Sequence, residues 1–254
     1  MGKVNLRLEL DGQLGRVLLN APKGNVLDAA MMRDVIAALE DLGGRSDLKL
    51  IVIEGAGDHF SFGASVEEHR AEQCGEMIPL FGGLFRALID TRVATLAAVR
   101  GQCLGGGMEL ALFCNWVFAH PTARFGQPEI RLGVFPPAAA IILPLLVGQA
   151  LADEVCLTGR TYTAAEALAR RLVHAVADDL EGAVRAFFSQ NLAAHSAASL
   201  RLALRASRHL FNRTFLDRWP ELEHLYLAEL MATHDANEGI QAYLDKRPAQ
   251  WLHR

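Results

Sequence analysis

The sequence predicts an α/β fold, in which a body of alternating strands and helices is followed by an all-helical C-terminal region. Strand-like and helix-like apolar patterns alternate through the first half of the chain. From about Leu180 onward the apolar spacing is helical throughout. The 254 residues, of which 51% are hydrophobic and 21% charged, suffice for one large globular domain or for a domain with an appendage.

The N-terminal part predicts two strands and a helix. Apolar and polar side chains alternate over residues 4–10, which is the pattern of a strand and not of a secretion signal. A second strand is expected at residues 17–19. Asp28 is a suitable N-cap for the helix that follows, and the pair Gly43-Gly44 is expected to end that helix.

The middle of the chain continues this alternation up to the helical region. Strands are expected at 48–53, 95–99 and 116–119, and helices at 67–89, 107–113, 138–147 and 150–157. Thr163 and Glu166 have the spacing of a capping box, which predicts the start of a further helix. A boundary near His195 divides the chain into a core, residues 1–195, and a C-terminal region, residues 196–254.

Composition argues against several classes of function. The net charge of −4 provides no basic field for nucleic acid or for an anionic membrane. The longest apolar run, residues 134–149, contains prolines and is too short to span a bilayer. The four cysteines lack the spacing of metal ligands. We therefore expect a cytoplasmic protein with no metal site and with neither nucleic acid nor a membrane as partner.

Two glutamates, twenty positions apart, carry the strongest chemical signal. Glu109 follows the run Gly105–Gly107 at the expected start of a helix, and Glu129 lies in the segment 124–130. Glycines allow close approach of the backbone to a ligand, and a helix N-terminus directs its N–H groups and positive dipole end toward that ligand. A second N–H group, from the loop 60–65, would complete an oxyanion hole. The two carboxyl groups would then serve as general acid and general base.

Each of these signals also has an ordinary structural explanation. A glycine run can mark tight packing between a helix and a strand. Glu109 could be an exposed residue in the first turn of a helix, where the dipole favours a carboxylate. Glu129 could form a surface salt bridge with Arg124 or Arg131. Only the joint occurrence of the signals favours a catalytic site.

The order of the motifs resembles the crotonase (enoyl-CoA hydratase/isomerase) superfamily over nearly the whole chain. The similar segments are 60–64, 105–110, 125–133, 157–159 and 164–167. The resemblance implies a ββα spiral core with a C-terminal helical region for trimerisation. It also implies an acyl-CoA substrate, no cofactor apart from the coenzyme A of that substrate, and a homotrimer or a dimer of trimers.

The resemblance assigns roles to individual residues. The backbone N–H groups of Ala64 and Gly106 would form the oxyanion hole. Glu109 and Glu129 match the two glutamates of the hydratase branch. We expect Glu109 to be the base that activates water and Glu129 to be the proton donor, although the two could share both roles through one water. The residues expected to bind coenzyme A are Lys23, Val26, Gly63, Ser65 and Val66.

The segment after Glu129 departs from the usual pattern of the superfamily. Residues 133–144 carry alanines and aliphatic side chains where glycines and polar residues are typical. An apolar wall of this kind suits a bulky hydrocarbon acyl group. We expect the acyl pocket to contain Phe135, Pro137, Ala138 and Ile141.

Other segments are similar to one subfamily, the cyclohexa-1,5-dienecarbonyl-CoA hydratases of anaerobic benzoyl-CoA degradation. These segments include 64–69, 100–104 and 242–254. The similarity implies addition of water to a cyclic dienoyl thioester, giving 6-hydroxycyclohex-1-ene-1-carbonyl-CoA.

Two alternatives stay open. One is a general 2-enoyl-CoA hydratase of fatty-acid or aromatic catabolism. The other is a non-catalytic relative that binds acyl-CoA or RNA, although the presence of both glutamates and the acidic net charge argue against it.

For His69 we expect a structural or exposed role. The apolar stripe that includes Met77 and Phe81 predicts core packing, part of which could line the acyl pocket.

Overall fold

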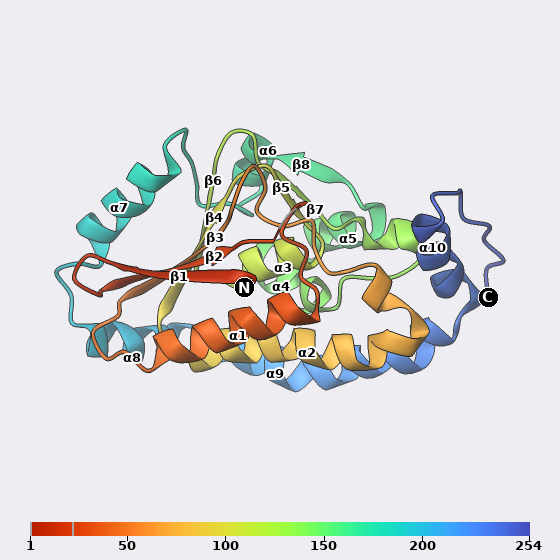
Figure 1. The fold of residues 1–254 in the computed structure, drawn as a ribbon, viewed down its shortest axis with the longest axis horizontal. Helices are drawn as coiled ribbons and strands as arrows, with labels where there is room; N and C mark the ends of the chain where they lie inside the picture. Colours follow the sequence, from red (N-terminus) through yellow and green to blue (C-terminus); the bar gives the residue numbers. More distant parts are fainter. Residues whose placement is uncertain (1, 22) are drawn as a thin grey trace.

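The computed structural model describes residues 2–21 and 23–254, which form a large sheet, a small sheet and the helices around them (Figure 1). The large sheet contains, in spatial order, β1 (Val4–Glu9), β2 (Leu14–Leu19), β3 (Leu50–Gly55), β4 (Ala94–Val99), β6 (Trp116–Ala119) and β9 (Ala175–Val176). Only β1 is antiparallel to its neighbour, and the other strands are parallel. The expected strands are confirmed, with boundaries shifted by a few residues.

The large sheet is covered on both faces, as expected of parallel strands. On one face Val17, Ile53 and Val99 belong to the main hydrophobic core, which the helices α1 (Ala29–Gly43) and α2 (Ala71–Asp90) share. On the other face Leu50 and Leu96 belong to a second core, which they share with α7 (Leu180–Asn191). The strands therefore read as nearly continuous apolar runs.

The small sheet was not predicted. Its three strands are β5 (Gln102–Leu104), β7 (Arg124–Gly126) and β8 (Thr161–Thr163). Each strand has three residues, too few to show a period of two. The two glycine-marked segments meet here, because β5 leads into Gly105 and β7 leads toward Glu129, and β5 pairs directly with β7.

The remaining helices are α3 (Gly106–Phe113), α4 (Pro137–Val147), α5 (Gln149–Thr158), α6 (Ala164–Ala169), α8 (Ala197–Ser207), α9 (His209–His224) and α10 (His234–Leu244). Short 3₁₀ turns occur at Glu67–His69 (η1), Pro128–Leu132 (η2) and Leu230–Ala232 (η4), and a π-helical turn at Leu225–Glu229 (η3).

The predicted helix caps are confirmed. Asp28 accepts from the N–H of Met31, Gly44 ends α1, and Thr163 forms a capping box with Glu166.

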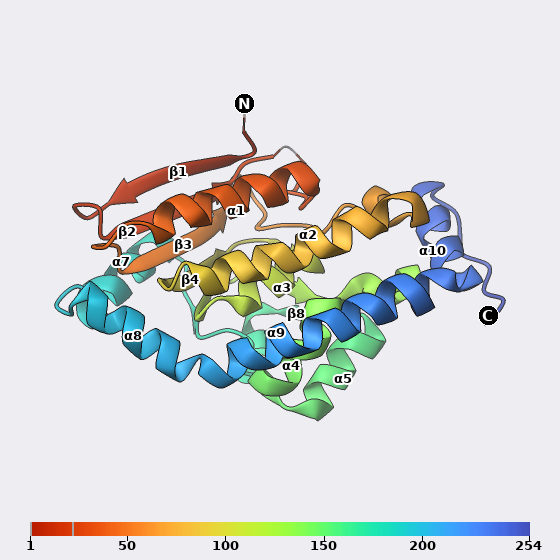
Figure 2. The ribbon, with the colours of Figure 1, turned by 90° about the horizontal axis from the view of Figure 1, so that it is seen from below.

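The C-terminal helices pack on the body of the same chain. Helix α9 lies along α2 and α4, as Figure 2 shows, and its Phe215 and Trp219 are fully buried in the main core. The chain after Leu244 is not helical, contrary to the expectation of helix throughout the tail. No helix in the described part of the chain is both long and apolar enough to cross a bilayer.

Candidate active site

A cavity lies where the loop after β3, the start of α3 and η2 come together. Many of the predicted site residues line it, namely Gly63, Ala64, Val66, Gly106, Glu109, Glu129, Phe135 and Pro137. The structure thus brings together segments that are up to about seventy residues apart in the sequence. His69, Met77 and Phe81 also line the cavity, so the apolar stripe of α2 contributes to the wall as well as to the core.

The two predicted oxyanion-hole donors are neighbours. An ideal Cβ on Gly106 would lie 3.2 Å from the backbone nitrogen of Ala64, and one on Gly63 would lie 3.3 Å from that of Gly106. Gly106 is the first residue of α3, so its N–H has no acceptor within the helix. Within residues 2–21 and 23–254, neither N–H donates to another protein group. Both are available to a carbonyl oxygen.

At each glycine of the run Gly105–Gly107, an added side chain would meet a different group. A Cβ on Gly105, whose φ is 49°, would lie 2.4 Å from Oε1 of Glu129. A Cβ on Gly106 would approach Ala64 as described above. A Cβ on Gly107 would lie 2.6 Å from the Cβ of Ser61, which is the tight packing that the alternative explanation proposed. That explanation is confirmed for Gly107 only, while Gly105 and Gly106 make room for the cavity and its carboxyl group.

Glu109 is buried, with 2% of its surface exposed, so the alternative of an exposed first-turn residue is wrong. Its Oε1 accepts the N–H of Ala139 at 2.7 Å, and the N–H of Ala138 lies close enough to favour the ionised form of this carboxyl group. These donors belong to the first turn of α4, where Pro137 provides none. The glutamate of one helix therefore caps the N-terminus of another.

Glu129 lies in η2 and lines the same cavity as Glu109. No ion pair joins it to Arg124 or Arg131 in the described part of the chain, and Arg124 donates instead to backbone carbonyl groups. The salt-bridge alternative is therefore wrong. The buried amide of Gln127, oriented with its nitrogen toward these acceptors, donates to both oxygens of Glu129 at 3.1 Å and to the carbonyl of Gly105 at 3.3 Å.

The environments of the two carboxyl groups differ. Burial raises the pKa of Glu109 to about 7, opposed by the N–H groups of Ala139 and Ala138, which favour the ionised form. Burial raises the pKa of Glu129 well above its usual value, and the negative charge of Glu109 raises it further. A proton shared by the pair therefore resides on Glu129, and Glu109 is the carboxyl group that ionises first. This arrangement provides a base and an acid at the same pH.

The pKa of Glu109 predicts a pH-dependent stability. The folded protein favours the neutral form of Glu109. Its contribution to the free energy of unfolding is therefore complete below pH 4.5 and is lost as the pH rises to about 7. The Glu109→Gln variant has no ionisable group at this position, so it does not lose stability in this way. We expect the variant to be more stable than the native protein at pH 8, by an amount on the order of 3 kcal/mol, and nearly equal to it at pH 4.5. Thermal unfolding at both pH values measures the difference, and a variant that is less stable at pH 8 would contradict the prediction.

The predicted acyl-pocket residues fall into two groups. Phe135 and Pro137 line the cavity, together with Val134. Ala138 and Ile141 do not belong to its lining, and both are buried within α4. The sequence interpretation placed them at the wall because it treated residues 133–144 as one surface, whereas only the part up to Pro137, the first residue of α4, lines the cavity. Ala138 acts through its N–H, which favours the ionised form of Glu109.

The residues expected to bind coenzyme A lie on two adjoining segments. The N–H of Leu27 donates to the carbonyl of Gly63 at 2.9 Å, which places the segment 23–26 beside the loop 62–66. Lys23 is exposed, with a φ of 64°, and Val26 is half-buried. Gly63 and Val66 line the cavity, whereas Ser65 does not and instead accepts from Nδ1 of His69 through its carbonyl.

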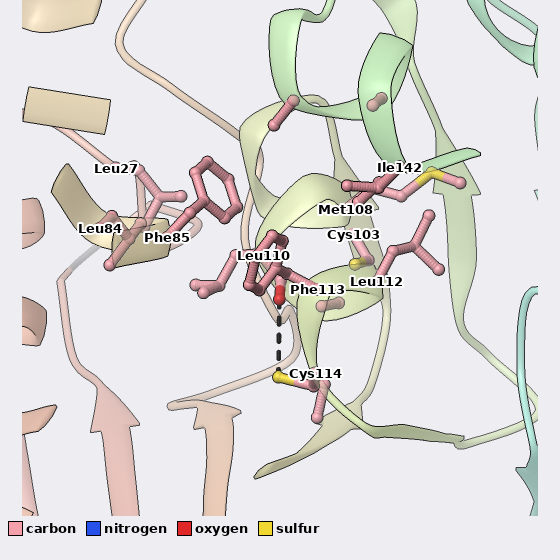
Figure 3. Close-up of a cluster of buried hydrophobic side chains, with 14 of the residues drawn as sticks. Leu27, Leu84, Phe85, Cys103, Met108, Leu110, Leu112, Phe113, Cys114 and Ile142 are labelled. Carbon is pink, nitrogen blue, oxygen red and sulfur yellow. Dashed lines mark hydrogen bonds between the residues drawn. The ribbon is translucent and has the colours of Figure 1, made fainter. Parts of the chain in front are cut away.

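Helix α3, which carries Glu109, is embedded in the core. All eight of its residues are buried, and apolar side chains from several elements surround it, as Figure 3 shows. Cys103 and Cys114 are part of this cluster, and the thiol of Cys114 donates to the carbonyl of Leu110 (Figure 3). Both cysteines act as small buried side chains, and the packing fixes the helix start that holds Gly106 and Glu109.

Gln127 and Asn25 are site residues that the sequence reasoning missed. The side chain of Asn25 donates to the carbonyls of Ala56, His59 and Phe60, and so fixes the segment 23–26 to the chain that leads into the loop 62–66. Gln127 lies two positions before Glu129 in a segment already singled out. A buried amide beside a carboxyl group gives no periodic signal, so only the pairing of β5 with β7 reveals its contact.

Comparison with known proteins agrees with this geometry. Residues 9–254 match the sequence profile of the enoyl-CoA hydratase/isomerase family, and the chain belongs to that family. It is 46% identical to the cyclohexa-1,5-dienecarbonyl-CoA hydratase of Thauera aromatica over 247 residues, which are 97% of this chain and 96% of that protein. It is 36% identical to a probable enoyl-CoA hydratase of Mycobacterium bovis over 252 residues, which are 97% of each.

The fold also agrees with that of solved enoyl-CoA hydratase structures. The crystal structure of an enoyl-CoA hydratase from Mycobacterium avium subsp. paratuberculosis K-10 superposes with a TM-score of 0.82 at 26% identity, covering 98% of each chain. The resemblance predicted from the motifs and the crotonase-like fold are therefore confirmed.

Proposed function

We propose that this chain is an acyl-CoA hydratase whose acid and base are Glu129 and Glu109. The observation that supports this most directly is a cavity with two carboxyl groups of unequal pKa and two unpaired backbone N–H groups. The thioester carbonyl would bind to the N–H groups of Ala64 and Gly106. Coenzyme A is part of the substrate, and the reaction requires no separate cofactor.

The proposed chemistry follows from these contacts. The two N–H groups stabilise negative charge on the thioester oxygen, which makes the β-carbon electrophilic. Ionised Glu109 takes a proton from water as the water oxygen bonds to that carbon. Protonated Glu129 then gives its proton to the carbon skeleton. The N–H groups at the start of α4 hold Glu109 in place, and Gln127 holds Glu129.

Within this class we propose cyclohexa-1,5-diene-1-carbonyl-CoA as the substrate and 6-hydroxycyclohex-1-ene-1-carbonyl-CoA as the product. The water oxygen adds to the β-carbon, the electrons of the diene move toward the thioester, and the far diene terminus takes the proton from Glu129. The product keeps a double bond conjugated to the thioester. The support is the 46% identity to the Thauera hydratase and the apolar wall of Val134, Phe135 and Pro137.

A general 2-enoyl-CoA hydratase is the second candidate, supported by the similarity to the mycobacterial protein. A panel of purified thioesters separates the two. We expect kcat/KM for the cyclic dienoyl-CoA to exceed that for crotonyl-CoA by about 10²-fold, because a cavity fitted to a ring gains little from a short chain. Higher kcat/KM for crotonyl-CoA would favour the second candidate, and no turnover of any thioester would favour a non-catalytic binding protein.

We also propose a cytoplasmic homotrimer or dimer of trimers, with the C-terminal region 196–254 at the subunit contacts. The tail helices support this, because Leu202 on α8 and Leu210 on α9 are 63% and 74% exposed in the single chain. Coenzyme A would lie along the segment 23–26 and the loop 62–66. The four cysteines are free, which suits a reducing compartment.

A further inference from the structure

Tyr226 carries a buried hydroxyl group that the mechanism above does not use. Its side chain is fully buried, and its hydroxyl has no hydrogen-bond partner in the part of the chain that the structure describes. Phenylalanine would fill the same space without leaving a polar atom unpaired, which costs free energy. We therefore expect this hydroxyl to form a hydrogen bond in another state of the protein.

The position of Tyr226 points to the active site. Its ring packs edge-on against Phe135, with centroids 5.2 Å apart, and lies 6.3 Å from the ring of His69. Phe135 and His69 both line the cavity, so Tyr226 lies directly behind its wall. The residue belongs to the π-helical turn η3, an irregularity that occurs frequently at functional sites.

The groups that face Tyr226 come from four elements. Burial raises its pKa far above the usual value, and the charges of Glu129 on η2 and Glu109 on α3 raise it further, while the thiol of Cys74 on α2 also lies nearby. Burial raises the pKa of Cys74 and lowers that of His69 on η1, so both are neutral near pH 7. Of the two carboxyl groups, Glu129 acts more strongly on Tyr226 and lines the cavity together with Phe135, which the Tyr226 ring contacts. Each oxygen of Glu129 accepts one bond from Gln127 and can accept a second, so Glu129 can accept the hydroxyl.

We propose that Tyr226 is a positioning residue for Glu129, and that its hydroxyl donates a hydrogen bond to the Glu129 carboxyl group when an acyl group occupies the cavity. Glutamate has three side-chain torsions, so this carboxyl group can shift without movement of η2. Held by Tyr226 on one side and Gln127 on the other, it has one orientation from which to deliver its proton. The role rests on the proposed hydratase function.

Tyr226→Phe tests this role. We expect kcat for the preferred acyl-CoA to fall roughly 10-fold, with little change in KM, because the variant loses orientation of the acid and not substrate binding. The hydroxyl stabilises the ionised form of Glu129, so its loss raises the pKa of that group. The alkaline limb of the pH–kcat profile therefore moves to higher pH. The melting temperature should stay equal or rise, because an unpaired hydroxyl is removed.

Tyr162→Phe is the matched control, since Tyr162 is also fully buried but donates to Glu154 at 3.0 Å, away from the cavity. It should keep the native kcat and pH profile. Native kcat and an unshifted alkaline limb in Tyr226→Phe would overturn the proposed role, and so would a loss of activity that parallels a loss of stability at every pH. Absence of hydratase activity in the native protein would overturn the proposed function, and this role with it.

Discussion

Replacing Glu109 by glutamine is expected to lower kcat for hydration by about 10²–10⁴-fold, which is the range that one general base contributes. Glutamine keeps the shape of the side chain and can still accept the N–H of Ala139, so the start of α4 remains capped. The variant cannot take a proton from water. Steady-state kinetics at pH 7 and pH 8 measure the loss, with KM expected to change far less than kcat.

Glu129→Gln should cause a loss of similar size, since it removes the proton donor. The double variant should be hardly slower than either single variant, because the acid and the base act as a unit and their effects do not add. Glu76→Gln is the control, since Glu76 is an exposed glutamate on α2 away from the cavity. Retention of native kcat by both active-site variants would rule out the mechanism.

The sequence was informative where local rules operate. Asp28, Gly44 and Thr163 obey capping chemistry that depends on a few neighbouring residues, and the structure confirms all three. The strands β1 to β4 and β6 of the large sheet have four to six residues, enough for their composition to identify them, whereas the two-residue strand β9 was not predicted. The site segments at Glu109 and Glu129 were found because glycines mark places where the backbone closely approaches another group.

The sequence was uninformative where contacts join distant segments. The burial of Glu109 depends on α4, whose first turn begins twenty-eight residues later. No sequence pattern around Glu109 distinguishes a buried carboxyl group from an exposed one. The alternative of an exposed Glu109 in the first turn of a helix therefore had to stay open. Ala138 and Ile141 were assigned to the acyl pocket for the same reason, since the direction of α4 decides which residues face the cavity.

Arg171 has an uncommon backbone conformation. It adopts a φ of 61°, in the left-handed region that glycine tolerates best, just after the end of α6. A glycine would adopt this conformation with less strain, and Arg171 lies outside the cavity lining.

Substitution of Gly106 by alanine should lower kcat by about 10²–10³-fold, the typical loss when one oxyanion-hole donor is disabled. The added methyl group would lie 3.2 Å from the nitrogen of Ala64 and 3.2 Å from the ring of Phe81, and so would enter the space between the two donors. The backbone of Gly106 needs no positive φ, so the alanine adds no conformational strain there. Melting temperature should therefore fall much less than activity.

Two other glycines, Gly107 and Gly75, make this test specific. Gly107→Ala would place a methyl group 2.6 Å from the Cβ of Ser61, so it should destabilise the fold because neither backbone can move freely. Gly75→Ala meets no atom within 4 Å on the exposed side of α2 and should leave both kcat and stability intact. If Gly106→Ala lost stability as Gly107→Ala does and kept its kcat, Gly106 would be a packing residue. A loss of kcat with stability retained distinguishes a donor that contacts the thioester oxygen from a glycine that only allows close packing.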